Sequence, residues 1–104
     1  MISDQICSEI ISKVVSVAAP LKIILFGSQV TGQARDDSDI DILVIKDHVA
    51  SKHRESVELW KALKSIPYPK DIIVATIEEY EFYRHQAGSI FRSANEEGIE
   101  IYVR

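Results

Sequence analysis

The stretch "LFGSQVTGQARDDSDIDILVI", Leu25 to Ile45, decides the fold because it joins two apolar runs through a polar loop. The first run ends at Gly27-Ser28, and the second begins with two aspartates, Asp39 and Asp41, at alternate positions. Successive side chains of a strand point to opposite faces, so the two carboxylates share a face, about 7 Å apart along the chain. Two like charges at the start of a buried strand require a physical explanation.

The rest of the chain alternates helical and strand patterns, which is typical of an α/β (α+β) domain. We expect Asp4 to cap the first helix and Pro20 to end it. From its length we expect one domain over residues 1–104, with a small mixed sheet of roughly three to five strands flanked by helices. The predicted strands are residues 21–27, 39–45, 71–76 and 99–103. The predicted helices are the one between the Asp4 cap and Pro20, 28–32, 51–65, about 88–97 and one that starts at 76.

Three patterns describe the later helices more closely. Thr76 and Glu79 have the spacing of a capping box at a helix start. Gly98 has the position of a glycine that ends a helix. The residues expected on the inner side of the 51–65 helix are Val57, Leu59, Trp60, Leu63 and Ile66.

The connections between the strands bring several polar side chains to one end of the sheet. The short loop after Gly27 favours an antiparallel pair, which places Ser28 near Asp39. The long helix that follows the second strand predicts a crossover to a parallel neighbour, and that neighbour begins with Asp71. We therefore expect Ser28, Asp39, Asp41 and Asp71 to converge at one sheet edge.

This convergence predicts a metal site. Three crowded carboxylates repel, and some of them stay protonated unless a cation lies between them. Mg²⁺ binds carboxylate and phosphate oxygens, and two such ions about 3.5–4 Å apart clamp the reacting oxygens of a phosphoryl-type displacement. Gly27 permits close backbone approach to a phosphate, and Ser28 offers a hydroxyl and an N–H at a helix N-terminus. The alternative is that these aspartates are solvated loop and turn residues.

The composition of the chain limits the classes of molecule that it is expected to bind. The net charge of −4 offers no cationic surface for a phosphate backbone, so a long nucleic acid is disfavoured. A nucleotide remains compatible if a metal supplies positive charge. No apolar run approaches the ~20 residues of a membrane span, and the N-terminal residues lack the pattern of a secretory signal. A single cysteine, Cys7, fits a reducing compartment, so we expect a cytoplasmic protein.

The motif Gly27-Ser28, residues 29–38, Asp39-x-Asp41 resembles the signature of the nucleotidyltransferase superfamily that includes polymerase β and kanamycin nucleotidyltransferase. The wording "SDIDILV" is especially similar to the minimal nucleotidyltransferases of bacteria and archaea. The resemblance covers nearly the whole chain, including the strand of Asp71 and the closing "ANEEGIEIYV". It implies a polymerase β-like nucleotidyltransferase fold and a metal-dependent transferase.

The resemblance also implies roles for individual residues. ATP or another nucleoside triphosphate would be the donor, bound through Gly27, Ser28 and Arg35, with two Mg²⁺ ions or Mn²⁺ in their place. Asp39 and Asp41 would hold the ion on the nucleotide, and Asp71 would join them on the catalytic ion. Asp71 would also help to deprotonate the acceptor hydroxyl.

One departure from the family pattern concerns the positive charges that meet the triphosphate. Minimal members commonly carry arginine where this chain has Gln29 or Thr31. Arg35 remains in the loop, and Lys46 follows the second strand. Donor binding is therefore expected to be weak, or the chain is a descendant that only binds its partner.

The acceptor is expected on a partner, because no part of the 104 residues is left to form an acceptor domain. Minimal nucleotidyltransferases resemble antitoxins that silence HEPN-type RNase toxins by attaching AMP to a toxin tyrosine. The resemblance thus implies a type VII-like antitoxin that forms homo- or hetero-oligomers. The alternatives are a non-catalytic module that neutralises its partner by binding and, less favoured by the acidic charge, an RNA-directed transferase. Some aromatic residues of the last third are expected to face a partner, and at least half to pack in the core: Tyr80, Phe82, Tyr83, Phe91 and Tyr102.

Overall fold

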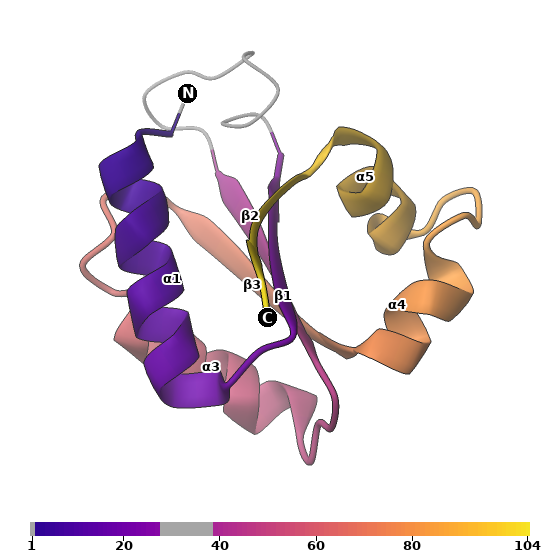
Figure 1. The fold of residues 1–104 in the computed structure, drawn as a ribbon, viewed down its shortest axis with the longest axis horizontal. Coiled ribbons are helices and arrows are strands. Elements are labelled where there is room, and N and C mark those ends of the chain that lie inside the picture. Colours follow the sequence, from indigo (N-terminus) through magenta and orange to yellow (C-terminus); the bar gives the residue numbers. More distant parts are fainter. Residues whose placement is uncertain (1, 28–38) are drawn as a thin grey trace.

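A computed structural model describes residues 2–27 and 39–104 and shows helices on both faces of a small sheet (Figure 1). The predicted α/β class is confirmed, with a sheet of four strands in the described part of the chain. The predicted helix at 28–32 and the loop after it lie outside the described residues. The elements are α1 (Asp4–Ala18), β1 (Lys22–Phe26), β2 (Ile40–Lys46), α3 (Lys52–Ala62), β3 (Lys70–Thr76), α4 (Ile77–Tyr83), α5 (Ile90–Glu97) and β4 (Ile99–Val103).

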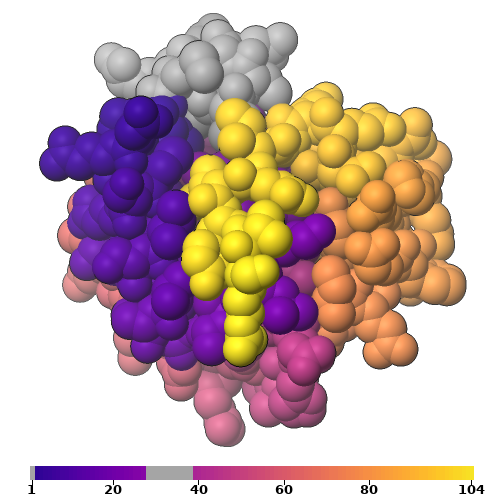
Figure 2. Space-filling view, in the orientation of Figure 1, coloured from indigo at the N-terminus to yellow at the C-terminus, as the bar shows by residue number. Residues whose placement is uncertain are grey.

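The sheet is mixed, with the strand order β3-β2-β1-β4. β1 pairs with β2 antiparallel, and β2 pairs with β3 parallel, as the connection lengths predicted. β4 returns to pair antiparallel with β1. β3 and β4 are therefore the two edge strands, and Figure 2 shows β4 lying across the front of the molecule between α1 on one side and α4 and α5 on the other.

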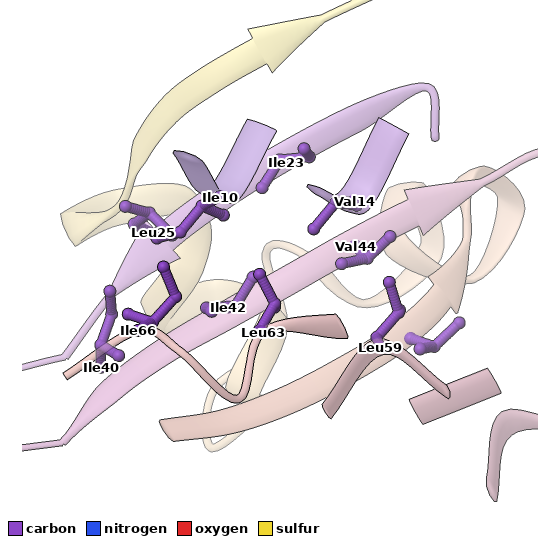
Figure 3. Packing of buried hydrophobic residues seen from close by; sticks show 11 residues of the cluster. Ile10, Val14, Ile23, Leu25, Ile40, Ile42, Val44, Leu59, Leu63 and Ile66 are labelled. Atoms are coloured by element: carbon purple, nitrogen blue, oxygen red, sulfur yellow. The ribbon is translucent and has the colours of Figure 1, made fainter. Parts of the chain in front are cut away.

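Two apolar clusters hold the helices against the two faces of the sheet. α1 and α3 cover one face, where alternate residues of β2 pack against Ile10 and Leu59 (Figure 3). On the other face, Leu43 packs in a cluster with Tyr80 of α4 and Phe91 of α5. Because both faces of β2 are covered, the strand is a nearly continuous apolar run after its first aspartate.

The ends of the helices follow local chemistry. Ser3, and not Asp4 as predicted, caps α1, because the Ser3 hydroxyl accepts a hydrogen bond from the Ile6 N–H at 3.2 Å. Thr76 caps α4 as predicted, accepting from the Glu79 N–H at 3.0 Å. Gly98 ends α5 as predicted, and a Cβ there would lie 2.2 Å from the Ala94 carbonyl oxygen.

The inner side of α3 differs from the prediction. Leu59, Leu63 and Ile66 are buried, but the side chains of Val57 and Trp60 are 39% and 48% exposed. Val57 and Trp60 are three residues apart and share a stripe of α3 that is turned away from the core. Leu63 follows the last helical residue and does not continue this stripe. The prediction was wrong for these two because α3 carries two apolar stripes and only one of them can face the sheet.

The aromatic residues of the last third divide as expected. Tyr80 and Phe91 are buried, and Tyr102 packs against the core. Phe82 and Tyr83 are exposed on α4. No helix in the described ranges is both long and apolar enough to cross a membrane.

Candidate active site

Asp41 of β2 and Asp71 of β3 face each other across the parallel pair, because the register joins these two residues. Their strand neighbours pack under α1 and α3, so both carboxylates project from the opposite face of the sheet. Neighbouring strands lie about 4.8 Å apart. The two side chains approach closely enough to share a hydrogen bond.

The electrostatics of this pair are unfavourable for two ionised groups. Burial raises the pKa of the Asp41 carboxyl above its ordinary value, and the negative charges of Asp71 and Asp39 raise it further. The hydrogen bond with Asp71 acts in the same direction, since one of the two groups must carry the proton. The fold therefore holds like charges together where a cation would relieve the repulsion.

Gly27 brings the end of β1 against the same carboxylate. Its φ is +96°, a conformation that side-chain-bearing residues rarely adopt, and a Cβ at this position would lie 2.5 Å from Asp41 Oδ2. The preceding residue, Phe26, is the register partner of Asp41. The expectation that β1 ends beside the start of β2 is thus confirmed, and the glycine is required both by conformation and by space.

Asp39 lies just before β2 and is exposed, and its charge contributes to the raised pKa of Asp41. Within residues 2–27 and 39–104, no three acidic, histidine or cysteine side chains are grouped closely enough to hold a metal ion together. The structure therefore brings Asp41 and Asp71 into contact and leaves Asp39 beside them. The donor set still fits Mg²⁺, because it consists of carboxylate oxygens whose mutual repulsion a cation would offset.

Three other residues are candidate contacts to the nucleotide. Ser28 and Arg35 are outside the described residues. Lys46 is the last residue of β2, so it lies about 23 Å along the strand from Asp39. Its ammonium group is paired with Glu55 of α3, and both side chains are less than one-fifth exposed, at 18% and 16%. Lys46 therefore belongs to the opposite end of the sheet and cannot replace a missing arginine.

A feature that the sequence did not reveal is a hollow beside Asp71. Val57 and Trp60 of α3 line it together with Lys70 and Asp71, and its volume is about 340 Å³. The signal in the sequence was a tryptophan within an otherwise polar helix, "KHRESVELWKA". Helical periodicity alone assigned that tryptophan to the core.

Comparisons with known proteins identify the family and the fold. The family model described as "Polymerase beta, Nucleotidyltransferase" matches residues 8–103. The chain belongs to this nucleotidyltransferase family, and its α/β fold is the polymerase β-like one.

Two solved structures share the fold. One is described as a toxin-antitoxin with AMP-PNP and is 20% identical in sequence. The match covers 94% of this chain and 73% of the matched chain, with a TM-score of 0.64. The other, a candidate nucleotidyltransferase from Sulfolobus solfataricus, is 17% identical, covers 96% and 79%, and gives a TM-score of 0.61. A search of curated proteins gives no significant match.

Proposed function

We propose that the chain is a metal-dependent nucleotidyltransferase that moves AMP from ATP onto a hydroxyl of a protein acceptor. The observation that carries this proposal is the contact between Asp41 and Asp71, in register on parallel strands, with Gly27 against Asp41. Membership of the nucleotidyltransferase family supports a transferase of this kind.

Asp39, Asp41 and Asp71 would hold two Mg²⁺ ions, or Mn²⁺ in their place. When bound, the ions would neutralise the triphosphate and fix the attacking and leaving oxygens. The absence of a side chain at Gly27 would let the triphosphate approach the end of β1 closely. The Asp71 carboxylate is exposed and would accept the proton of the acceptor hydroxyl. Ser28 and Arg35 are proposed as further contacts to the nucleotide.

We propose a tyrosine of a HEPN-type toxin as the acceptor, in a cytoplasmic type VII-like antitoxin system. The supporting observation is the shared fold with the toxin-antitoxin structure that contains AMP-PNP. ATP is preferred to other donors on the same ground. The acceptor would be presented by the partner surface, in a hetero-oligomer of antitoxin and toxin.

A second candidate is neutralisation by binding alone. It is favoured by one observation, the pairing of Lys46 with Glu55 at the far end of the sheet. Together with Gln29 and Thr31, this leaves Arg35 as the remaining expected cation for the triphosphate. The carboxylates would then be inherited without a catalytic task.

The two candidates are separated by mixing the product of the neighbouring gene with the chain, ATP and Mg²⁺. Under the transferase proposal, intact mass spectrometry shows the partner gaining the mass of AMP with the native chain and none with Asp41→Asn, which still binds the partner. The neutralisation candidate predicts that Asp41→Asn protects cells as well as the native chain, with no mass added by either.

A further inference from the structure

The groove between α3 and the edge strand β3 is the feature that the proposed function leaves unexplained. Two hollows of about 280 and 340 Å³ lie along it and share His53, Ser56 and Ile72 as lining residues. Lys52 lines one end, where its ammonium group pairs with Glu79 of α4 at 2.5 Å. Asp71 lines the other end. We call this surface the edge groove; the strand that borders it, β3, also carries Asp71, whose carboxylate projects from the other face of the sheet.

The backbone of β3 faces this groove with unpaired hydrogen-bonding groups. β3 has β2 on one side and, in the described part of the chain, no strand on the other. The Ile40 N–H donates a hydrogen bond to the Pro69 carbonyl at 2.9 Å. In a parallel pair, this bond means that the odd-numbered residues of β3 are the ones that bond to β2. Residues of β3 bond to β2 alternately, so the N–H and C=O groups of Ile72 and Val74 point to the free edge. Alternating donors and acceptors in a row fit one kind of ligand, an extended peptide main chain.

The side chains around the groove add apolar and charged contacts. Trp60 and Val57 line the hollow near Asp71 and are 48% and 39% exposed, so they offer apolar area to a ligand. Lys70 lies at the same end and forms no ion pair with any described residue. On a chain with net charge −4, this lysine favours an acidic side chain in the ligand.

We propose that the edge groove binds an extended, acidic and partly apolar segment of the acceptor protein as an added strand on β3. Successive side chains of an added strand point to opposite faces of the sheet. The segment would therefore place an apolar side chain against Trp60 and an acidic one near Lys70 on the α3 face, and its acceptor hydroxyl at Asp71 on the other face. This rests on the proposed function, because the groove is assigned to the acceptor of that reaction. From Val74 to Lys70 the edge spans about 13 Å, so about four or five residues of the segment would pair.

A peptide fits the edge groove better than the other ligands of this site. A nucleotide base would stack on Trp60 but would leave the amides of Ile72 and Val74 unpaired. A second copy of this chain would pair both edges, but it would leave the site without the acceptor hydroxyl that the proposed function requires. Because β3 itself carries Asp71, a strand added along its free edge would run past the carboxylate pair, which favours the acceptor.

The test uses a library of peptides that have one central tyrosine and random flanking residues. Peptides are selected for binding to the native chain in the absence of ATP. The variants are Trp60→Ala and Ile72→Pro; proline is tolerated on an edge strand but removes the donor at residue 72. The matched control is Phe82→Ala, an exposed aromatic residue of α4. We expect each variant to bind the selected peptides at least about tenfold more weakly than the native chain, while the control changes the affinity by less than about twofold. Circular dichroism establishes that each variant is folded.

Amide hydrogen exchange by NMR gives the second readout. The bound peptide should slow exchange at Ile72 and Val74 by at least about tenfold and leave the β4 edge unchanged. The proposal is overturned if no peptide is enriched, if Trp60→Ala and Ile72→Pro bind like the native chain, or if protection appears elsewhere. It is also overturned if sedimentation shows a dimer whose Ile72 amide is already protected, since a second copy then occupies the edge.

Adding ATP and Mg²⁺ afterwards separates this proposal from the proposed function. Peptides that bind in the edge groove but gain no AMP would contradict the transfer and leave the docking surface intact. Peptides that gain AMP equally with the native chain and Trp60→Ala would contradict the docking surface and leave the transfer intact.

Discussion

The two ends of β2 carry charged groups in opposite arrangements. At one end, Lys46 pairs with Glu55, and the hydrogen bond from the lysine lowers the pKa of that carboxyl. The Glu55 carboxylate also accepts a hydrogen bond from the Ser51 N–H at 3.0 Å and so helps to begin α3. At the other end, Asp41 meets Asp71 and its pKa is raised.

The difference separates charges that stabilise the fold from charges that await a ligand. The ion pair of Lys46 and Glu55 is complete within the chain. The carboxylate pair has no compensating cation among the described side chains and costs free energy unless a ligand supplies one. Perturbed carboxylates at the end of a sheet are candidates for function for this reason.

Asp71→Asn should give the largest effect on function. Losing one carboxylate removes a proposed metal ligand and the proposed proton acceptor, so AMP transfer should fall by at least about a hundredfold. The melting temperature should stay equal or rise, because the repulsion with Asp41 is relieved. Intact mass spectrometry of the acceptor and a thermal melt measure both quantities. A variant that transfers AMP at the native rate would remove Asp71 from the mechanism.

Binding of a divalent ion at the carboxylate pair should stabilise the folded protein. At a hundredfold excess over the dissociation constant, Mg²⁺ or Mn²⁺ with nucleotide should add about 2.7 kcal/mol to the free energy of unfolding. The gain should disappear on adding a chelator and in Asp41→Asn. Thermal melts with and without the ion measure it. An unchanged melting curve for the native chain would contradict the metal site.

Lys46→Met should show the reverse pattern at the other end of β2. Glu55 would lose its charged partner in a site where its side chain is 16% exposed, which should cost about 1–2 kcal/mol of stability. AMP transfer should not change, since Lys46 is remote from the carboxylates. Denaturant unfolding measures the loss, and Lys13→Met, at an exposed pair on α1, is the matched control with a smaller effect. Loss of transfer at full stability would place Lys46 in the site after all.

The pH dependence of the free energy of unfolding should have opposite signs for the carboxyl groups at the two ends of β2. It is the smallest of the predicted effects. Asp41 binds its proton more tightly in the folded state, so its contribution favours folding at low pH and is lost as pH rises from about 3.8 through the raised pKa. Glu55 binds its proton less tightly when folded, so its contribution is present above its ordinary value of 4.5 and is lost as pH falls through the lowered pKa.

Unfolding at several pH values, without divalent ions, would compare the native chain with Asp41→Asn and with Glu55→Gln. The two difference curves should slope in opposite directions. Curves of the same sign would show that one of the two electrostatic environments is assigned incorrectly.

The sequence alone predicted the order of the described elements and the directions of β1, β2 and β3. The alternation of two aspartates with isoleucines predicted which face of β2 carries the carboxylates, and connection length predicted the antiparallel and parallel pairs. These two facts were sufficient to bring Gly27, Asp41 and Asp71 to one end of the sheet. They depend on local geometry and chain connectivity, which a sequence encodes directly.

Only the tertiary structure decided how the groups at each site meet. It showed that Asp41 contacts Asp71 while Asp39 lies to one side, and that Lys46 is paired with Glu55. It also turned Trp60 out of the core toward the edge of β3. The rotation of α3 depends on how its side chains fit the sheet beneath it, and partners across strands depend on register. Both are set by packing between segments far apart in the chain, which periodicity within one segment does not contain.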